Sequence, residues 1–101
     1  MDATEQLLQA LTDAHGVPGY ETEVRAVLRG YMEPLGEVTQ DKLGSLLCHV
    51  PGPGPKVMLV GHMDEIGFIT THVTDDGFVK FLPLGGWWDQ VLLGQRVLIK
   101  T

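Results

Sequence analysis

The chain has 101 residues, of which 44% are hydrophobic and 20% are charged, values typical of one ordinary globular domain. Its formal net charge is -6, which argues against nucleic acid or an anionic membrane as a partner, because both would need a basic patch. Asp2 and Glu5 stand where a signal peptide would carry positive charge, and no apolar run approaches the length of a membrane helix. We therefore expect a cytoplasmic protein with no nucleic-acid and no membrane partner.

The first third of the chain is predicted to form two helices. Leucines at helical spacing predict a helix over residues 4–12, with Thr4 available as its cap. Pro18 and Gly19 then make a turn, after which an apolar stripe predicts a second helix over residues 21–32.

Short strands are predicted next. Residues 37–40 and 46–50 are expected to pair around a turn at residues 41–44. The Pro-Gly loop at residues 51–55 cannot join a ladder. Residues 56–61 are almost continuously apolar, which is typical of a strand covered on both faces, so we expect this strand at the centre of a sheet.

The last third of the chain shows strand patterns and no helical one. Residues 66–73 and 77–82 are predicted to form a hairpin, and residues 91–101 to end in a further strand. A segment of predicted helices and strands is followed by a segment of predicted strands alone, which indicates a domain boundary near residue 70.

Two further features of composition bear on the fold. Cys48 is the only cysteine, so no disulfide framework is possible, and we expect it to pack as a small apolar residue. Trp87 and Trp88 are adjacent, so in a strand one would face inward and the other outward. An outward tryptophan is a candidate interface anchor.

The segment that follows the apolar run carries the strongest chemical signal. His62 and Asp64 are two residues apart, so at the end of a strand they would project from the same face. Asp64 could then accept a hydrogen bond from one imidazole nitrogen and leave the other nitrogen for a metal. A carboxylate behind a ligating histidine fixes its tautomer and orientation and raises its basicity. A His-x-Asp triplet also recurs by chance, so the longer string has to support it.

The longer string, residues 57–68, resembles the first metal-ligand motif of metallopeptidase family 42, aminopeptidases that assemble into hollow tetrahedral particles. Three further segments agree with that family in order and spacing: Gly16–Glu21 with Val24 and Arg25, Asp41–Gly44, and Gly85–Val97. One departure is Ser45, which follows Gly44 where the family commonly has asparagine. The resemblance covers essentially all of these residues, but only the amino-terminal part of a family member.

The resemblance implies an α/β fold and a hydrolase. Residues 1–70 would begin a three-layer αβα zinc-peptidase catalytic domain, and residues 71–101 would begin an inserted β-rich dimerisation domain. Two divalent ions, zinc or cobalt, would assist hydrolysis of the amino-terminal peptide bond of peptide substrates. His62 would ligate one ion, and Asp64, which the family assigns as catalytic, would orient His62 without transferring a proton. The remaining ligands and the general base would lie beyond residue 101, and the family forms homo-oligomers in which dimers assemble into a dodecamer.

Two alternatives to this function stay open. One histidine and one orienting aspartate fall short of the three protein ligands typical of catalytic zinc, so the chain alone is predicted to be inactive, a non-catalytic interaction or structural fragment. Some relatives carry an endoglucanase label, but glycosidases need two carboxyls about 5 to 9.5 Å apart across the sugar. Asp64 and Glu65 would point to opposite faces of a strand, so we expect a structural role for Glu65. His15, His49 and His72 are likewise expected to be structural.

Overall fold

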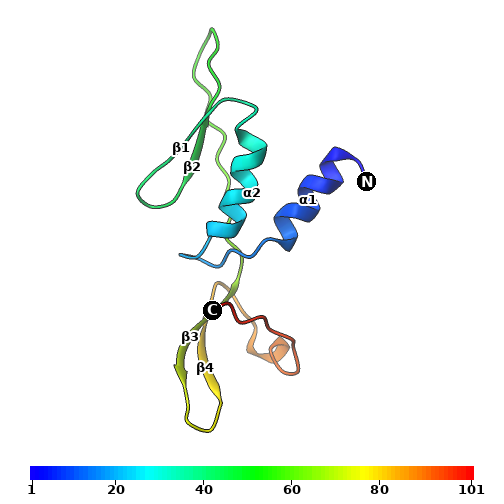
Figure 1. Ribbon diagram of the computed structural model, residues 1–101, viewed down its shortest axis with the longest axis vertical. Coiled ribbons are helices and arrows are strands. Elements are labelled where there is room, and N and C mark those ends of the chain that lie inside the picture. Colours follow the sequence, from blue (N-terminus) through cyan, green and yellow to red (C-terminus); the bar gives the residue numbers. More distant parts are fainter. The chain divides into compact units, whose positions relative to one another are not determined.

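The computed structural model describes residues 1–101 and contains two helices and two separate antiparallel hairpins (Figure 1). The chain divides into two compact units, residues 1–65 and residues 66–101. The division falls a few residues before the boundary predicted near residue 70. The assignment of residues 1–70 to a catalytic domain and of residues 71–101 to an inserted domain stays a prediction.

Helix α1 (Ala3–Asp13) begins with a capping box. The Asp2 carboxylate accepts a hydrogen bond from the Glu5 N–H at 2.9 Å, and the Glu5 carboxylate accepts one from the Asp2 N–H at 2.8 Å. Two N–H groups that the first turn would leave unpaired are thereby satisfied. The predicted helix is confirmed to within a residue at each end, but its cap is Asp2 and not Thr4.

Helix α2 (Thr22–Met32) contributes the centre of a small core in the first unit. Val24 is only 4% exposed, and Ala14 and Gly16 from the connection between the helices are also buried. A Cβ added at Gly16 would lie 2.6 Å from Val24 Cγ1, so a side chain at this position would force the connection away from α2. The His15 N–H also donates to the Glu23 carboxylate at 3.1 Å. The connection is therefore held closely on the first turn of α2.

Strands β1 (Glu37–Gln40) and β2 (Leu46–His49) form the predicted antiparallel pair, with Val38 opposite Cys48. Cys48 is half-buried, and its thiol donates to the Met32 carbonyl at 3.6 Å. Cys48 therefore packs the hairpin against the end of α2, and the structure assigns it no disulfide.

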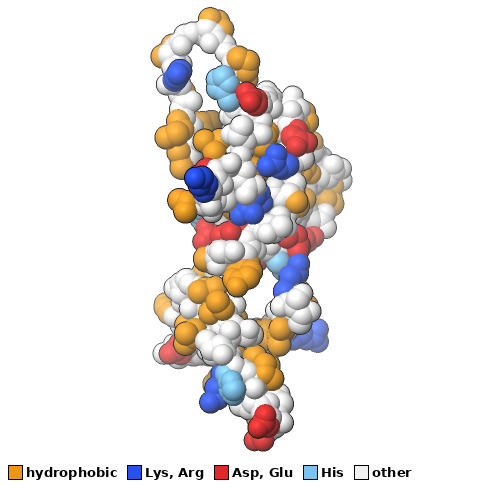
Figure 2. All heavy atoms as spheres, turned by 60° about the vertical axis from the view of Figure 1, so that its left-hand side comes forward, with side chains coloured by type: hydrophobic (Ala, Val, Ile, Leu, Met, Phe, Trp, Pro, Cys, Tyr) orange, Lys and Arg blue, Asp and Glu red, His pale blue; other side chains and the backbone are white.

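The predicted strand over residues 56–61 is wrong. This segment pairs with no other strand, and the side chains of Val57, Met58, Leu59 and Val60 are 80 to 93% exposed. A buried strand needs a partner on each side, and here β1 and β2 pair only with each other. The strand predicted at the end of residues 91–101 is absent for the same reason. Many hydrophobic side chains consequently lie on the visible surface (Figure 2).

The second unit is built on a hairpin of β3 (Gly67–Val73) and β4 (Val79–Leu84), which confirms the predicted hairpin. The Phe68 ring stacks on the Trp87 ring, with the ring centroids 4.8 Å apart. It meets the Phe81 ring edge-on, with the centroids 4.7 Å apart. The Trp87 indole N–H donates to the Gly67 carbonyl at 3.0 Å. These aromatic contacts hold the segment after β4 against the hairpin.

Trp87 packs on Phe68 and Trp88 is largely exposed, and neither is in a strand. Trp88 is 78% exposed and precedes a single 3-10 turn, η1 (Asp89–Val91). Its role as an interface anchor stays a prediction. No helix in the chain has the length and apolar character needed to cross a membrane.

Candidate functional site

The His62 imidazole is fixed by Asp64. Its Nδ1 lies 3.0 Å from the Asp64 carboxylate Oδ1 and 3.0 Å from the Asp64 carbonyl oxygen. Both oxygens are acceptors here, so Nδ1 must carry the hydrogen, and the lone pair of the neutral ring is on Nε2. The predicted hydrogen bond is thus present, and the nitrogen left over is the one that could bind a metal.

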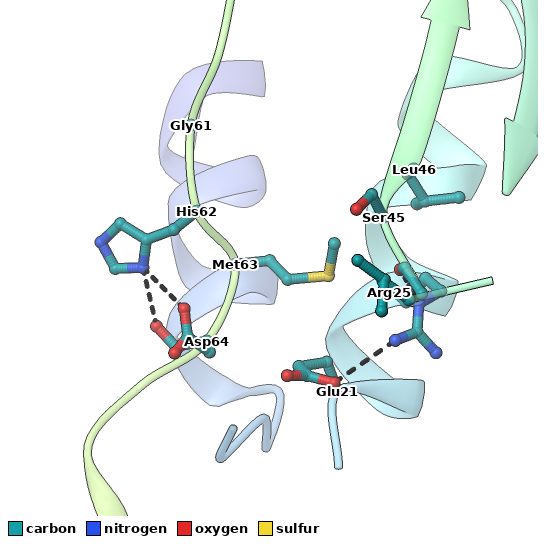
Figure 3. Close-up of a pocket in the computed structure, with 10 residues that line it drawn as sticks. Glu21, Arg25, Ser45, Leu46, Gly61, His62, Met63 and Asp64 are labelled. Carbon is teal, nitrogen blue, oxygen red and sulfur yellow. Dashed lines mark hydrogen bonds and ion pairs between the residues drawn. The ribbon is translucent and has the colours of Figure 1, made fainter. Parts of the chain in front are cut away.

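The side chains of this segment alternate in direction, as Figure 3 shows. His62 and Asp64 project to one side of the backbone, and Met63 projects to the other, toward α2. The His62 side chain is 86% exposed and that of Asp64 is 40% exposed. Alternation requires only an extended backbone and no paired strand, which is why the contact forms although the predicted strand does not.

Glu65 joins the end of the motif to the connection between the helices. Its N–H donates to the Gly16 carbonyl at 2.7 Å, and its carboxylate accepts a hydrogen bond from the Gly16 N–H at 3.2 Å. We call this pair of hydrogen bonds the Gly16–Glu65 clamp. It gives Glu65 the structural role that the sequence predicted.

A hollow of about 220 Å³ lies on the Met63 side of the motif (Figure 3). Arg25 lines it on the side of α2: Nε donates to the Gly44 carbonyl at 2.7 Å, and the guanidinium pairs with Glu21 at 3.4 Å. Glu21 also accepts a hydrogen bond from the Gly19 N–H at 2.7 Å. These contacts of Arg25 were not predicted from the sequence. The four-residue spacing of Glu21 and Arg25 on one helix was the available signal for the ion pair.

Asp41 organises the turn between β1 and β2. Its carboxylate accepts hydrogen bonds from the N–H groups of Ser45 at 2.8 Å and Leu43 at 2.9 Å. The bond from the Ser45 backbone, and after it those from the Ser45 side chain and the turn amides, lower the pKa of Asp41 from its ordinary value of 3.8. Hydrogen bonds to the charged form favour ionisation. The turn thereby presents the Gly44 carbonyl to Arg25.

We expect this turn to loosen in acid. Because the folded pKa of Asp41 is depressed, the stability it contributes is complete above 3.8 and is lost as the pH falls through the lower, folded value. Hydrogen exchange at the Ser45 amide should accelerate, relative to its intrinsic rate, over that acid range. The Asp41→Asn variant should lack this acid-dependent change. Unchanged Ser45 protection down to the lowest pH at which the fold survives would contradict the prediction.

Comparison with known proteins identifies the family. The family model of the M42 glutamyl aminopeptidases matches residues 44–101, more than half of the chain. The chain belongs to this family. A second family model, named AMPT, matches residues 2–28.

Relatives of this M42 chain carry aminopeptidase names. A protein of Escherichia coli (strain K12), FrvX, which is provisionally named an aminopeptidase, is 48% identical over 95% of the chain and 27% of its own length. The lysyl aminopeptidase of Pyrococcus furiosus is 34% identical over 95% of the chain and 28% of its own length. The glutamyl aminopeptidase of Lactococcus lactis is 35% identical over 93% of the chain and 28% of its own length.

A solved structure shares the M42 chain's fold. The crystal structure of a TET aminopeptidase from Thaumarchaeota archaeon SCGC AB-539-E09 aligns with a TM-score of 0.85 and 44% identity, over 93% of this chain and 27% of that one. The helices and small antiparallel sheets therefore match the amino-terminal region of a TET aminopeptidase. The M42 chain spans about a quarter of the length of the relatives it matches.

His62 is the candidate metal ligand of the M42 chain. No group of three or more His, Cys, Asp or Glu side chains is arranged to hold a metal ion. His62 nevertheless fits a ligand's role. Its ring is exposed, and its tautomer is fixed because Asp64 binds Nδ1 and not Nε2. The other ligands of a catalytic site would have to come from residues outside 1–101.

Proposed function

We propose that the chain is the amino-terminal part of a metal-dependent aminopeptidase that releases amino-terminal residues from peptides. The observation that carries the proposal is the His62 ring held through Nδ1 by Asp64, with Nε2 left to bind a metal. It occurs in a chain of the M42 family, whose relatives include a lysyl and a glutamyl aminopeptidase.

His62 would hold one of two divalent ions, zinc or cobalt, through Nε2. Divalent ions in such a site act as Lewis acids that polarise the scissile carbonyl and make a water nucleophilic near neutral pH. An imidazole nitrogen suits both metals, so this ligand alone does not select one of them.

Asp64 would act on the reaction only through His62. Its carboxylate and its carbonyl oxygen both accept from Nδ1–H, which keeps the ring from rotating and keeps Nε2 in the ligating form. Asp64 would transfer no proton to or from the substrate, because its hydrogen bonds hold the ligand. The remaining ligands, the general base and the pocket that selects the amino-terminal residue would be supplied by later parts of the protein.

The assembly is proposed from the resemblance to the M42 family. Residues 71–101, which include β4, would begin an inserted β-rich dimerisation domain, and dimers would assemble into a dodecamer. The cytoplasmic location also stays a prediction.

The isolated 101 residues are proposed to be inactive. Val57 to Val60 are almost fully exposed, which indicates that strands from the rest of the protein would cover this segment. The same exposure favours the second candidate, a non-catalytic interaction fragment. A glycosidase finds less support, because the Asp64 carboxylate is engaged by His62 and the Glu65 carboxylate by Gly16.

Amino-acid p-nitroanilides provide the test. We expect the full-length protein that contains this chain to hydrolyse leucyl, lysyl or glutamyl p-nitroanilide with added zinc or cobalt. A chelator should abolish the activity and either metal should restore it, whereas the 101-residue chain should hydrolyse nothing. A full-length protein that is inactive on a broad p-nitroanilide panel with either metal would contradict the aminopeptidase proposal and favour the interaction fragment.

A further inference from the structure

Glu65, one of the two residues of the Gly16–Glu65 clamp, directly follows Asp64, the residue that holds His62. Glu65 binds Gly16 through two groups, its own N–H at 2.7 Å and its carboxylate at 3.2 Å. Two hydrogen bonds to one residue fix both position and orientation, whereas a single bond leaves a free rotation. The backbone at Glu65 is therefore fixed against the connection between α1 and α2.

The connection is itself fixed where the clamp meets it. Gly16 is buried, and an added Cβ would lie 2.6 Å from Val24 Cγ1 and 3.6 Å from the Met63 carbonyl oxygen. Ala14 and Val24 are the two buried hydrophobic residues of the chain, and both lie in or under this connection. The most tightly packed part of the first unit thus lies directly behind the motif.

The part of the motif that carries His62 and Asp64 belongs to no helix or strand. Residues 56–61 belong to no ladder, and His62 is 86% exposed. The Asp64 carbonyl oxygen, which accepts from His62 Nδ1, belongs to the peptide unit whose N–H is that of Glu65. That same N–H donates to the Gly16 carbonyl. One peptide group therefore connects the clamp to the imidazole.

We propose that Glu65 is a positioning residue: through the Gly16–Glu65 clamp it orients the 64–65 peptide, and this peptide aligns His62 for a divalent metal. The inference rests on the proposed function. It assigns Glu65 no part in proton transfer and no contact with substrate. The part of the side chain that matters is an oxygen that reaches the Gly16 N–H, and its charge is secondary.

Two conservative variants of the full-length protein distinguish the effect of the length of the Glu65 side chain from the effect of its charge. Glu65→Gln keeps a carbonyl oxygen at the same reach and removes the charge, whereas Glu65→Asp keeps the charge and withdraws the oxygen by one methylene. We expect Glu65→Asp to weaken zinc or cobalt binding about ten-fold, the low end for residues that act through a ligand, and Glu65→Gln to bind nearly as the wild type does. Metal affinity is measured by competition with a chromogenic chelator.

A matched control lies at the other end of α2. The exposed Glu33 carboxylate pairs with Arg29 at 3.9 Å, so Glu33→Asp shortens the same kind of side chain away from the clamp. It should leave metal affinity unchanged. If Glu33→Asp weakens metal binding as much as Glu65→Asp does, the effect does not depend on the clamp and the positioning role is overturned.

Hydrogen exchange in the metal-free protein distinguishes failure of the clamp from failure of the proposed function. The Gly16 and Glu65 amides should be protected in the wild type and in Glu65→Gln, and the Gly16 amide should lose protection in Glu65→Asp. Absence of protection in the wild type overturns the clamp, whatever the activity. Protected amides in a protein that binds no metal refute the proposed function, and the alignment role with it. If Glu65→Gln binds metal normally but is inactive, Glu65 acts as an acid or base and the positioning role is overturned.

Discussion

Replacing His62 by alanine should abolish the hydrolysis of amino-acid p-nitroanilides by the full-length protein. Residues that only orient a metal ligand typically contribute 10- to 100-fold, so loss of the ligand itself should lower kcat/KM by more than about 100-fold. The structure gives the reason, because Nε2 of His62 is the nitrogen that Asp64 leaves available. Metal content per protomer, measured on the same samples, should fall with the activity.

His49 and His72 supply matched controls for this substitution. Both are exposed, His49 in β2 and His72 in β3, and neither belongs to the motif. Alanine at either position should leave metal content and kcat/KM close to the wild-type values. A His62→Ala protein that keeps its metal and its activity would refute the ligand role and leave the interaction fragment as the better account.

The local elements were predictable because their signals are local. Leucine spacing located α1, and the alternation around the Asp41 turn located β1 and β2. The cap of α1 was misassigned to Thr4, although Asp2 with Glu5 three residues later is the capping-box spacing. Competing caps within two residues of each other are decided by side-chain geometry, which the pattern does not contain.

The strand predicted over residues 56–61 failed for a different reason. Its apolar pattern is typical of a covered strand, but no strand among these 101 residues pairs with it. A pattern of burial is a property of the whole fold, whereas a ladder needs partners that are present. The exposure of Val57 to Val60 is therefore consistent with the sequence signal, even though the predicted element is absent.

The hydrogen bond between His62 and Asp64 was predictable from the sequence, but the contacts around it were not. Two-residue spacing was enough to place the Asp64 carboxylate on the His62 ring, since only one extended segment is involved. The Gly16–Glu65 clamp joins residues 49 positions apart, and the bond of Arg25 to Gly44 joins residues 19 apart. No periodicity connects such positions, so contacts of this kind emerge only from the folded chain.

Replacing Asp64 should lower activity strongly, but less than replacing His62. His62 Nδ1 has two acceptors at 3.0 Å, the carboxylate and the backbone carbonyl of Asp64, and Asp64→Ala removes only the first. The remaining carbonyl still favours the tautomer with its lone pair on Nε2. We therefore expect kcat/KM to fall about 10- to 100-fold, with metal affinity reduced in parallel.

Asp64→Asn refines this prediction, because it keeps an oxygen that can accept from Nδ1–H and removes only the charge. Its kcat/KM and its metal affinity should lie between those of the wild type and those of Asp64→Ala. The control Asp75→Asn, in the exposed turn between β3 and β4, should change neither quantity. Metal affinity and kcat/KM measured together decide between roles. A parallel fall means that the carboxylate orients the ligand, whereas an inactive Asp64→Asn protein with undiminished metal affinity would mean that Asp64 takes part in proton transfer, contrary to its hydrogen bonds in this structure.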